Sequence, residues 1–368
     1  TLSQSRFLSS GVELTEEEKA QVWTIPLSVL KTDGTVAGTI VLTEPRQILT
    51  LPCEAEEFLK LNAGYKTLAR INYPDEVFEK IKESLLKGAL SQKEFVVDRA
   101  GLINDAYAFA RAGKLDTTTV LSLLESFTGE KEYLVWLQIT DTLLGISSIL
   151  KENSEDGFNS FSCRILENIV SDVGWDAKEN ETFEDSLKRP VVLGVYGRAG
   201  DINTVDEARR RFQENLKTPG SLHPDLFGFA VNLIARNGDS KTFDDLLGHY
   251  RKARKNESIE EMVRLLSAMA LFKQKDVIEK SLEFMLTDDE VRGQDMIYFV
   301  RGISDNKFAI RIAWEFFKAN AEEIMKEMGS ELHVGAAAKA ICSGFSSAEE
   351  AVEVEEYFKQ NPVPKTSQ

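Results

Sequence analysis

Residues 98–113 read Asp-Arg-Ala-Gly-Leu-Ile-Asn-Asp-Ala-Tyr-Ala-Phe-Ala-Arg-Ala-Gly. The apolar side chains in this stretch recur with the spacing of one stripe of an α-helix: Leu102, Ala106, Phe109 and Ala110. Asp98 suits the positive end of a helix dipole, and Gly113 follows the last turn, where a residue with positive φ ends a helix at low cost. The many alanines let another helix approach closely. The stretch therefore predicts a helix packed tightly against a neighbour.

Helical periodicity continues from this stretch to the end of the chain and begins after Tyr73-Pro74. The pattern predicts helices at 75–87, 92–112, 117–127, 131–151, 158–172, 184–198, 203–216, 223–236, 240–254, 258–271, 273–286, 292–302, 305–328, 331–343 and 347–359. Three of them carry a capping-box signal, at Ser91-x-x-Glu94, Ser258-x-x-Glu261 and Ser347-x-x-Glu350.

A weak internal repeat organises these helices. The strings Ala110–Asp116, Gly197–Asn203 and Ala235–Lys241 each combine a helix end, a glycine and a polar restart. Gly200 and Gly238 lie 38 positions apart, which is the period of a helix pair of the HEAT or armadillo kind. Such pairs bury a continuous core only by stacking, and the stack bends into a concave surface. We therefore expect an α-solenoid.

The first 62 residues show a different pattern, with short β-rich runs separated by polar turns. We predict strands at 22–30, 39–43, 48–51 and 58–61, and residues 6–8 form a further strand or a tail. Pro26 marks a sheet edge or a bulge. The fold class is therefore mainly α, an α-solenoid preceded by a small β-sandwich. The predicted domains are a β-sandwich at 1–62, the helical solenoid at 63–361 and a flexible tail at 362–368.

Composition limits the partners. Of the 368 residues, 42% are hydrophobic and 28% are charged, as in an ordinary globular protein. The net charge of −16 repels phosphate backbones, so we expect no nucleic acid partner. No apolar run is long enough to span a bilayer, and the start of the chain has no signal-peptide pattern. We expect no membrane association. Because the chain lacks an initiator methionine, we interpret it as a fragment.

Cysteine usage indicates a reducing compartment. Cys53, Cys163 and Cys342 are odd in number, far apart and in apolar surroundings, which predicts buried free thiols rather than a disulfide framework. The expected location is cytoplasmic.

The sequence contains no recognisable catalytic apparatus. The histidines His223, His249 and His333 stand outside any H-E-x-x-H motif, and we expect no metal site. Nucleophile-elbow and Walker A motifs are absent. The glycine-rich run at 194–200 ends a helix rather than following a strand, so a nucleotide site is not expected there.

Four segments, in order, resemble a known family. The first joins Gln4-x-Arg-Phe-Leu8 with Trp23-Thr-Ile-Pro-Leu27, and the second joins Leu59-Lys-Leu-Asn62 with Ala69-Arg-Ile-Asn-Tyr73. The third is the stretch 98–113, and the fourth is Val291-Arg-Gly-Gln-Asp295 with Ala313-Trp-Glu-Phe-Phe317 and Gly344-Phe345. Together they resemble the C-terminal region of M1-family zinc aminopeptidases of the puromycin-sensitive and fungal cytosolic type. The family usually has an aromatic residue where this chain has Ala69.

The resemblance implies a division of labour. The family's zinc ligands, catalytic glutamate and G-A-M-E-N motif lie upstream of the sandwich, so this chain is expected to hold no cofactor and to be inactive alone. The resemblance places the expected zinc in a catalytic domain that is not part of this chain. The family's helical domain is a bowl that closes over the catalytic cleft and admits peptides. Peptides and the catalytic domain of the same polypeptide are therefore the implied partners.

Arg70, Arg292 and Gln294 are the candidates for contact with substrate in the chamber, because a guanidinium suits a peptide carboxylate. The competing interpretation, which we favour, is a structural salt bridge near a helix start. For the whole chain the alternative hypothesis is a free-standing α-solenoid scaffold for protein–protein interaction. An upstream H-E-x-x-H motif would separate the two.

Overall fold

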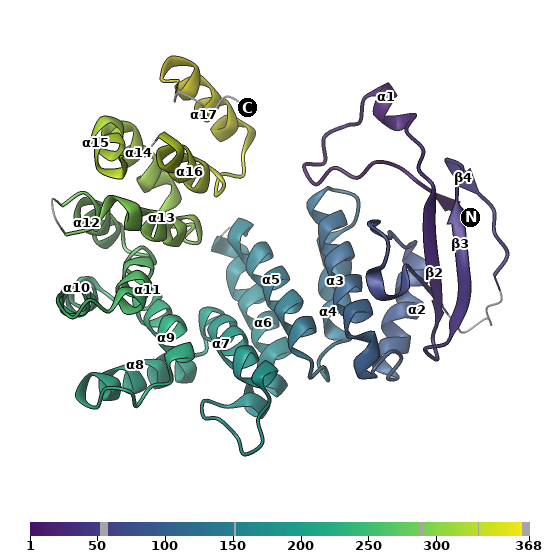
Figure 1. Cartoon of the computed structure of the whole chain (residues 1–368), viewed down its shortest axis with the longest axis horizontal. Helices are drawn as coiled ribbons and strands as arrows, with labels where there is room; N and C mark the ends of the chain where they lie inside the picture. Colours follow the sequence, from purple (N-terminus) through teal and green to yellow (C-terminus); the bar gives the residue numbers. More distant parts are fainter. Residues whose placement is uncertain (52–57, 151, 288–289, 330, 363–368) are drawn as a thin grey trace. The chain divides into compact units, whose positions relative to one another are not determined.

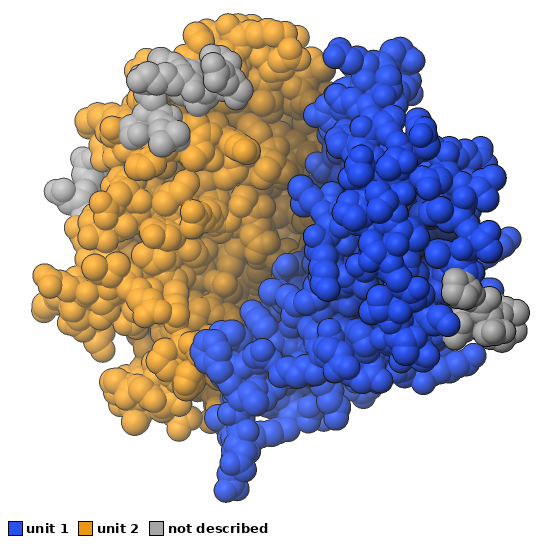
Figure 2. Space-filling view, turned by 45° about the vertical axis from the view of Figure 1, so that its right-hand side comes forward, with its two compact units in different colours: residues 1–143, 164–192 blue, residues 144–163, 193–368 orange. Residues whose placement is uncertain are grey.

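The computed structural model describes residues 1–51, 58–150, 152–287, 290–329 and 331–362. The chain divides into two compact units, which Figure 2 colours separately. Unit 1 comprises Thr1–Leu143 and Arg164–Val192, and unit 2 comprises Leu144–Cys163 and Leu193–Gln368. Three helices contribute residues to both units: α5 (Tyr133–Ile149), α6 (Glu152–Val173) and α7 (Phe183–Arg198).

The N-terminal part of unit 1 forms two small antiparallel sheets. Strand β2 (Ile25–Lys31) lies between β3 (Val36–Leu42) and β5 (Leu59–Leu61), while β1 (Leu2–Ser3) pairs with β4 (Arg46–Gln47). A single helical turn, α1 (Glu16–Lys19), precedes β2. Leu27, Val29 and Leu30 of β2 are buried and supply the core of the larger sheet. Because β5 pairs only with residues 29–31 of β2, Pro26 lies where β2 is itself an edge, as predicted.

The strand prediction at 48–51 is wrong, since the pairing of β1 with β4 ends at Gln47 and Ile48 is exposed. Of the two alternatives for residues 6–8, the strand is excluded, because the paired residues are Leu2 and Ser3. The side chain of Phe7 instead packs edge-to-face on Phe109.

Helices make up the rest of the chain, as predicted (Figure 1). In unit 1 they are η1 (Ala63–Tyr65), α2 (Asp75–Leu86), η2 (Lys93–Phe95), α3 (Val96–Arg111) and α4 (Thr117–Glu125). In unit 2 they are α8 (Ile202–Lys217), α9 (Pro224–Arg236), α10 (Ser240–Lys255), α11 (Ile259–Met269), α12 (Lys275–Met285), η3 (Gly293–Asp295), α13 (Met296–Ser304), α14 (Ile310–Ala319), α15 (Ala321–Met328), α16 (Glu331–Cys342) and α17 (Ala348–Gln360). None of the described helices is both long and apolar enough to cross a membrane.

The predicted helix at 305–328 is wrong as a single element. It consists of α14 and α15, which meet at Asn320, a residue with non-helical backbone angles (φ −120°, ψ 21°). The Asn320 side chain donates to the carbonyl oxygen of Phe316 at 2.8 Å and so satisfies the end of α14. An asparagine that bonds its own backbone in this way competes with helix continuation, while the apolar periodicity of the sequence hides the break.

The polar residues that follow the repeat glycines act as helix N-caps. Asp201 and Asp239, each directly after a repeat glycine, accept a hydrogen bond from the backbone N–H three residues later, at 2.7 Å and 2.9 Å. The capping box at Ser347 is confirmed. Those predicted at Ser91 and Ser258 are wrong, because neither position has a side-chain cap.

Consecutive helices in unit 2 pack as neighbours, which confirms the paired architecture. Helix α11 contacts α9, α10 and α13, and α8 packs on α9. Helices α11 and α13 approach closely at Gly302, where a Cβ atom would clash with the carbonyl oxygen of Ser267 and lie 2.7 Å from the Cβ of Ala270. Glycine is therefore required at position 302 by helix packing rather than by backbone conformation.

The last helix is fastened by one carboxylate. Glu353 of α17 accepts hydrogen bonds from Arg311 Nη1 at 2.6 Å, Trp314 Nε1 at 2.8 Å and Lys318 Nζ at 2.8 Å, all on α14. These donors, the arginine first, lower the pKa of Glu353 to about 2. The ring of Tyr357, one turn further along α17, packs against Trp314.

We predict that Gly302→Ala lowers the free energy of unfolding by roughly 1–3 kcal/mol, because the added methyl group has no room between α11 and α13. The matched control is Gly248→Ala in α10, where nothing lies within 4 Å of the new methyl group. The control should stabilise the chain by about 0.5–1 kcal/mol. Urea unfolding measures both, and equal effects would contradict the close packing.

The contacts of Glu353 should also make the free energy of unfolding depend on pH. A carboxylate with a depressed pKa stabilises the fold above its unfolded pKa, near 4.5, and this contribution disappears as pH falls toward about 2. Glu353→Gln should therefore cost about 1 kcal/mol at pH 7, a value reduced by solvent screening, and progressively less below pH 4.5. Urea unfolding from pH 7 to pH 3 tests this, with the exposed Glu356→Gln as control. A cost that does not change with pH would contradict it.

Candidate functional site

A buried ion pair holds the segment that leads from the sheet to the helices. This junction segment, residues 62–74, follows β5 and precedes α2. Lys60 of β5 is 1% exposed, and its Nζ lies 2.6 Å from Oδ1 of Asp98 on α3. The same oxygen accepts the backbone N–H of Gly64 at 2.7 Å. Burial lowers the pKa of Lys60, and the hydrogen bond to Asp98 opposes that shift.

Lys60 also satisfies main-chain acceptors at the start of the junction segment. Its ammonium group donates to the carbonyl oxygens of Leu61 at 3.3 Å and Asn62 at 3.1 Å. The Asn62 side chain then donates to the carbonyl oxygen of Thr67 at 2.8 Å, and the hydroxyl oxygen of Tyr73 accepts the backbone N–H of Leu61 at 3.0 Å. The segment is thus fixed at several points.

A second carboxylate of α3 holds the other end of the segment. Asp105 accepts the backbone N–H of Ile71 at 2.9 Å and a guanidinium N–H of Arg70 at 3.1 Å. Burial raises the pKa of Asp105, and the contacts from Tyr65, Ile71 and Arg70 oppose the shift. The two carboxylates therefore lie two turns apart on one helix and anchor both halves of the junction segment.

The glycine of the stretch 98–113 has a packing role. The ring of Tyr65 lies over Gly101, so any Cβ at this position would collide with it. The Tyr65 hydroxyl donates to the carbonyl oxygen of Gly101 at 2.5 Å. Arg99 pairs with Glu130 at 2.6 Å and donates to the carbonyl oxygens of Leu90 and Gln92. These contacts account for Gly101 and Arg99 as structural residues, and no catalytic role is needed to explain them.

Of the three candidate chamber residues, Arg70 lies in the junction segment and makes several side-chain contacts there. Its side chain is 36% exposed, and its Nη1 donates to Oδ1 of Asn104 as well as to Asp105. The ring of Phe7 lies 5.4 Å from the guanidinium carbon. Asn104 in turn donates from Nδ2 to Oε1 of Gln138 on α5 at 2.9 Å. We call Arg70, Asn104 and Gln138 the polar row.

The other two candidates lie in unit 2, at η3. Arg292 is half-exposed and its Nε donates to Asp295 at 2.6 Å, whereas Gln294 is exposed. Both candidate arginines therefore form the salt bridge that the competing interpretation predicts. A part for Arg70, Arg292 or Gln294 in binding substrate stays a prediction.

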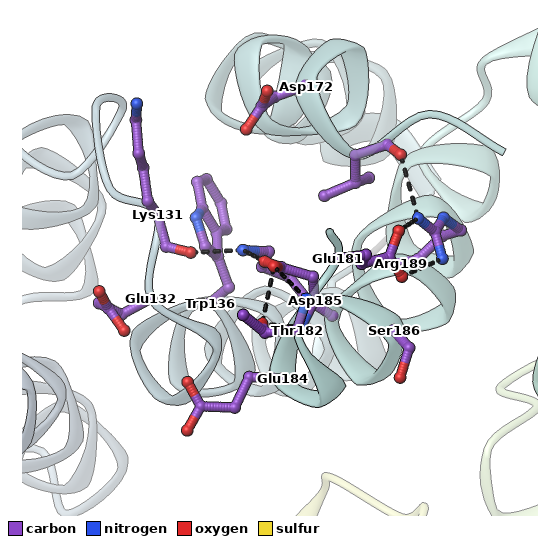
Figure 3. A network of polar contacts seen from close by, with 12 residues as sticks. Lys131, Glu132, Trp136, Asp172, Glu181, Thr182, Glu184, Asp185, Ser186 and Arg189 are labelled. Atoms are coloured by element: carbon purple, nitrogen blue, oxygen red, sulfur yellow. Dashed lines mark hydrogen bonds and ion pairs between the residues drawn. The ribbon is translucent and has the colours of Figure 1, made fainter. Parts of the chain in front are cut away.

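A further polar network joins α7 to the connections around it (Figure 3). Lys188 is buried, and its Nζ donates to the carbonyl oxygen of Lys131 at 2.5 Å and pairs with Asp185 at 2.8 Å. Arg189 is buried beside it and binds Glu181 through two nitrogens. The hydrogen bond from Lys188, and after it the one from the Thr182 hydroxyl, lowers the pKa of Asp185 to about 2. The network closes the α6–α7 connection and has a structural role.

Basic residues at two helix ends of unit 2 share one acid. Arg198 and Arg236 are the last residues of α7 and α9, and both pair with Asp305, at 2.8 Å and 2.5 Å. Burial lowers the pKa of Arg236 to about 10, and the neighbouring Arg198 adds to the effect. Lys307 pairs with Glu155 at 3.0 Å. The two arginine pairs tie the ends of α7 and α9 to the α13–α14 turn, and the lysine pair ties α6 to the same turn.

The thiols and histidines form no metal site in the part of the chain that the structure describes, where no group of three or more His, Cys, Asp or Glu side chains could hold an ion. Cys163 and Cys342 are half-buried thiols, and the Cys163 thiol donates to the carbonyl oxygen of Ala199 at 3.7 Å. Burial raises the pKa of Cys342 to about 11. Cys53 lies outside the described residues. His223 caps α9, and its Nδ1 accepts the N–H of Asp225 at 3.3 Å.

Sequence reasoning found Arg70 but missed the residues that position it. Lys60 appears in one of the strings that resemble the family, but the sequence predicts no role for it, nor for Tyr65 or Gln138. A lysine in a strand and a glutamine on a helix are ordinarily surface residues. The one available signal was the apolar setting of Lys60 between Leu59 and Leu61.

Comparisons with known proteins agree with the resemblance. A family model described as the ERAP1-like C-terminal domain matches residues 58–368. The chain is 26% identical to Aminopeptidase 2 of Candida albicans over 98% of its own length, and 26% identical to the Puromycin-sensitive aminopeptidase of Caenorhabditis elegans over 97%. It is 28% identical to the Alanine/arginine aminopeptidase of Saccharomyces cerevisiae over 89%.

The chain spans well under half of these relatives, 38%, 38% and 37% of their respective lengths. The match nevertheless covers the junction segment, the anchoring helix α3 and all the helices that follow. The chain therefore belongs to the ERAP1-like C-terminal domain family of the M1 aminopeptidases.

Proposed function

We propose that the chain is the non-catalytic C-terminal part of a zinc-dependent aminopeptidase that releases N-terminal amino acids from peptides. Its helical region is the cap that encloses the peptide chamber and gates access to it. The observation that carries this proposal is the family match over residues 58–368, together with relatives that are named aminopeptidases.

The proposed domains follow the sequence prediction, with a β-sandwich at 1–62, a helical cap at 63–361 and a tail at 362–368. The start of the family match at residue 58 supports a boundary near β5. Stacked helix pairs offer an extended surface on which a peptide can lie, and an enclosed chamber excludes folded proteins. The proposed partners are peptides and the catalytic domain of the same polypeptide, in the cytoplasm, without nucleic acid.

Zinc is proposed for the catalytic domain and not for this chain. The described residues offer no ligand set for it, so we assign no step of the hydrolysis to them. Their proposed work is to bind and orient the peptide and to limit access.

Arg70, Arg292 and Gln294 are proposed as chamber residues. The two arginines already carry an acidic partner each, at 3.1 Å and 2.6 Å. Their charge is therefore largely cancelled, and what remains for a ligand is a set of N–H donors. Such donors suit a carbonyl oxygen at least as well as a carboxylate.

We predict that the full-length protein encoded by the same gene carries an upstream H-E-x-x-H motif with a further glutamate. It should release N-terminal residues from short peptides at least tenfold faster than from a folded protein with the same N-terminal sequence, because the cap admits only extended chains. Release rates measured by mass spectrometry test this prediction. The control is the folded protein after denaturation and alkylation, which should become a substrate.

Two results would contradict the proposal. Equal rates on the folded and extended substrates would contradict the gating cap. A complete gene product without the zinc motif would contradict the aminopeptidase and favour the free-standing scaffold.

A further inference from the structure

The polar row runs from the junction segment to α3 and α5 of unit 1, at equal sequence intervals. Arg70, Asn104 and Gln138 are separated by 34 positions each, and hydrogen bonds connect the first to the second and the second to the third. The two hydrogen bonds make the row continuous from the junction segment through α3 to α5.

Each member of the row has hydrogen-bonding capacity that the contacts above leave unused. Within the described residues, Gln138 uses only Oε1, so both N–H groups of its Nε2 have no protein partner. Arg70 uses only Nη1, which leaves Nε and Nη2. Asn104 retains one N–H and one lone pair of Oδ1.

The row is also held in place before any ligand arrives. Asn104 and Gln138 are half-buried on helices, and Arg70 is fixed by the buried Asp105 and by the ring of Phe7. Fixed donors lose little conformational freedom on binding, which favours affinity.

Because the polar row has no net charge, it favours a neutral ligand. Asp105 balances Arg70, and the two amides carry no charge, so the row offers alternating N–H donors and oxygen acceptors without net charge. The main chain of an extended peptide offers the complementary set, one C=O and one N–H per residue, with each face repeating every second residue.

We infer that the polar row binds the main-chain amides of an extended peptide and so holds substrates irrespective of their side chains. This inference rests on the proposed function and names the part of the peptide that the helical surface recognises. It assigns Asn104 and Gln138 a binding role alongside Arg70.

The test uses the 368-residue chain and a neutral probe, the blocked peptide acetyl-(Ser-Ala)4-amide carrying a fluorophore. Binding is measured by fluorescence anisotropy and by the side-chain amide signal of Gln138 in an NMR spectrum. We expect Gln138→Met to weaken binding about tenfold, because it removes the free donors while keeping the length of the side chain. A probe with alternate amides replaced by esters should bind the wild-type chain about tenfold more weakly as well.

The matched control is Gln213→Met, which changes an exposed glutamine on α8 and should leave the affinity unchanged. Circular dichroism confirms that each variant is folded. Binding should also change little between low and high salt, because neither side carries net charge.

The outcomes separate the two proposals. If the amide probe binds wild type and Gln138→Met equally, or if the ester probe binds as well as the amide probe, the polar row is excluded while peptide binding by the cap stands. If the folded wild-type chain binds no probe at all, the row and the proposed peptide-binding cap are both overturned.

Discussion

The ion pair between Lys60 and Asp98 is the interaction on which the rest of unit 1 depends. Both side chains are almost fully buried, and their charged atoms lie 2.6 Å apart. Taking two such charges out of water costs several kcal/mol, and the pair forms only because further hydrogen bonds satisfy what remains of both groups. Here these bonds come from the main chain of the junction segment: the carbonyl oxygens of Leu61 and Asn62 and the N–H of Gly64. The charges therefore determine the path of the backbone.

The backbone path of the junction segment positions the residues on which the functional proposal rests. Once Asp98 fixes the start of the junction segment, Asp105 on the same helix fixes its end through Ile71 and Arg70. Arg70 then stands beside Asn104, and Asn104 beside Gln138. The motif at 98–113 thus acts through positioning. Asp98 and Asp105 are bound to the junction segment, and the half-buried amide of Asn104 remains available to a ligand.

The sequence reveals the helices well because each leaves a local signature. The stripe of α3, the glycine at 113 with positive φ and the aspartate caps after Gly200 and Gly238 are all readable within a few residues. The features that the sequence does not predict depend on contacts with residues far away in the chain, or leave no local signal. Residues 48–51 have strand-like composition, yet no neighbouring strand extends to them. The break at Asn320 is invisible because the apolar period continues across it. The structural role of Lys60 depends on its ion pair with Asp98, 38 positions later in the chain.

The most direct measurement of the central claim is native-state hydrogen exchange at the backbone amides of Gly64 and Ile71. Each N–H is bonded to a carboxylate of α3, at 2.7 Å and 2.9 Å, rather than to regular secondary structure. If the two carboxylates fix the junction segment, we predict that both amides exchange only through cooperative unfolding of unit 1, as slowly as the amides of α3 itself. Exchange of either amide at the rate of a freely moving loop would contradict that claim.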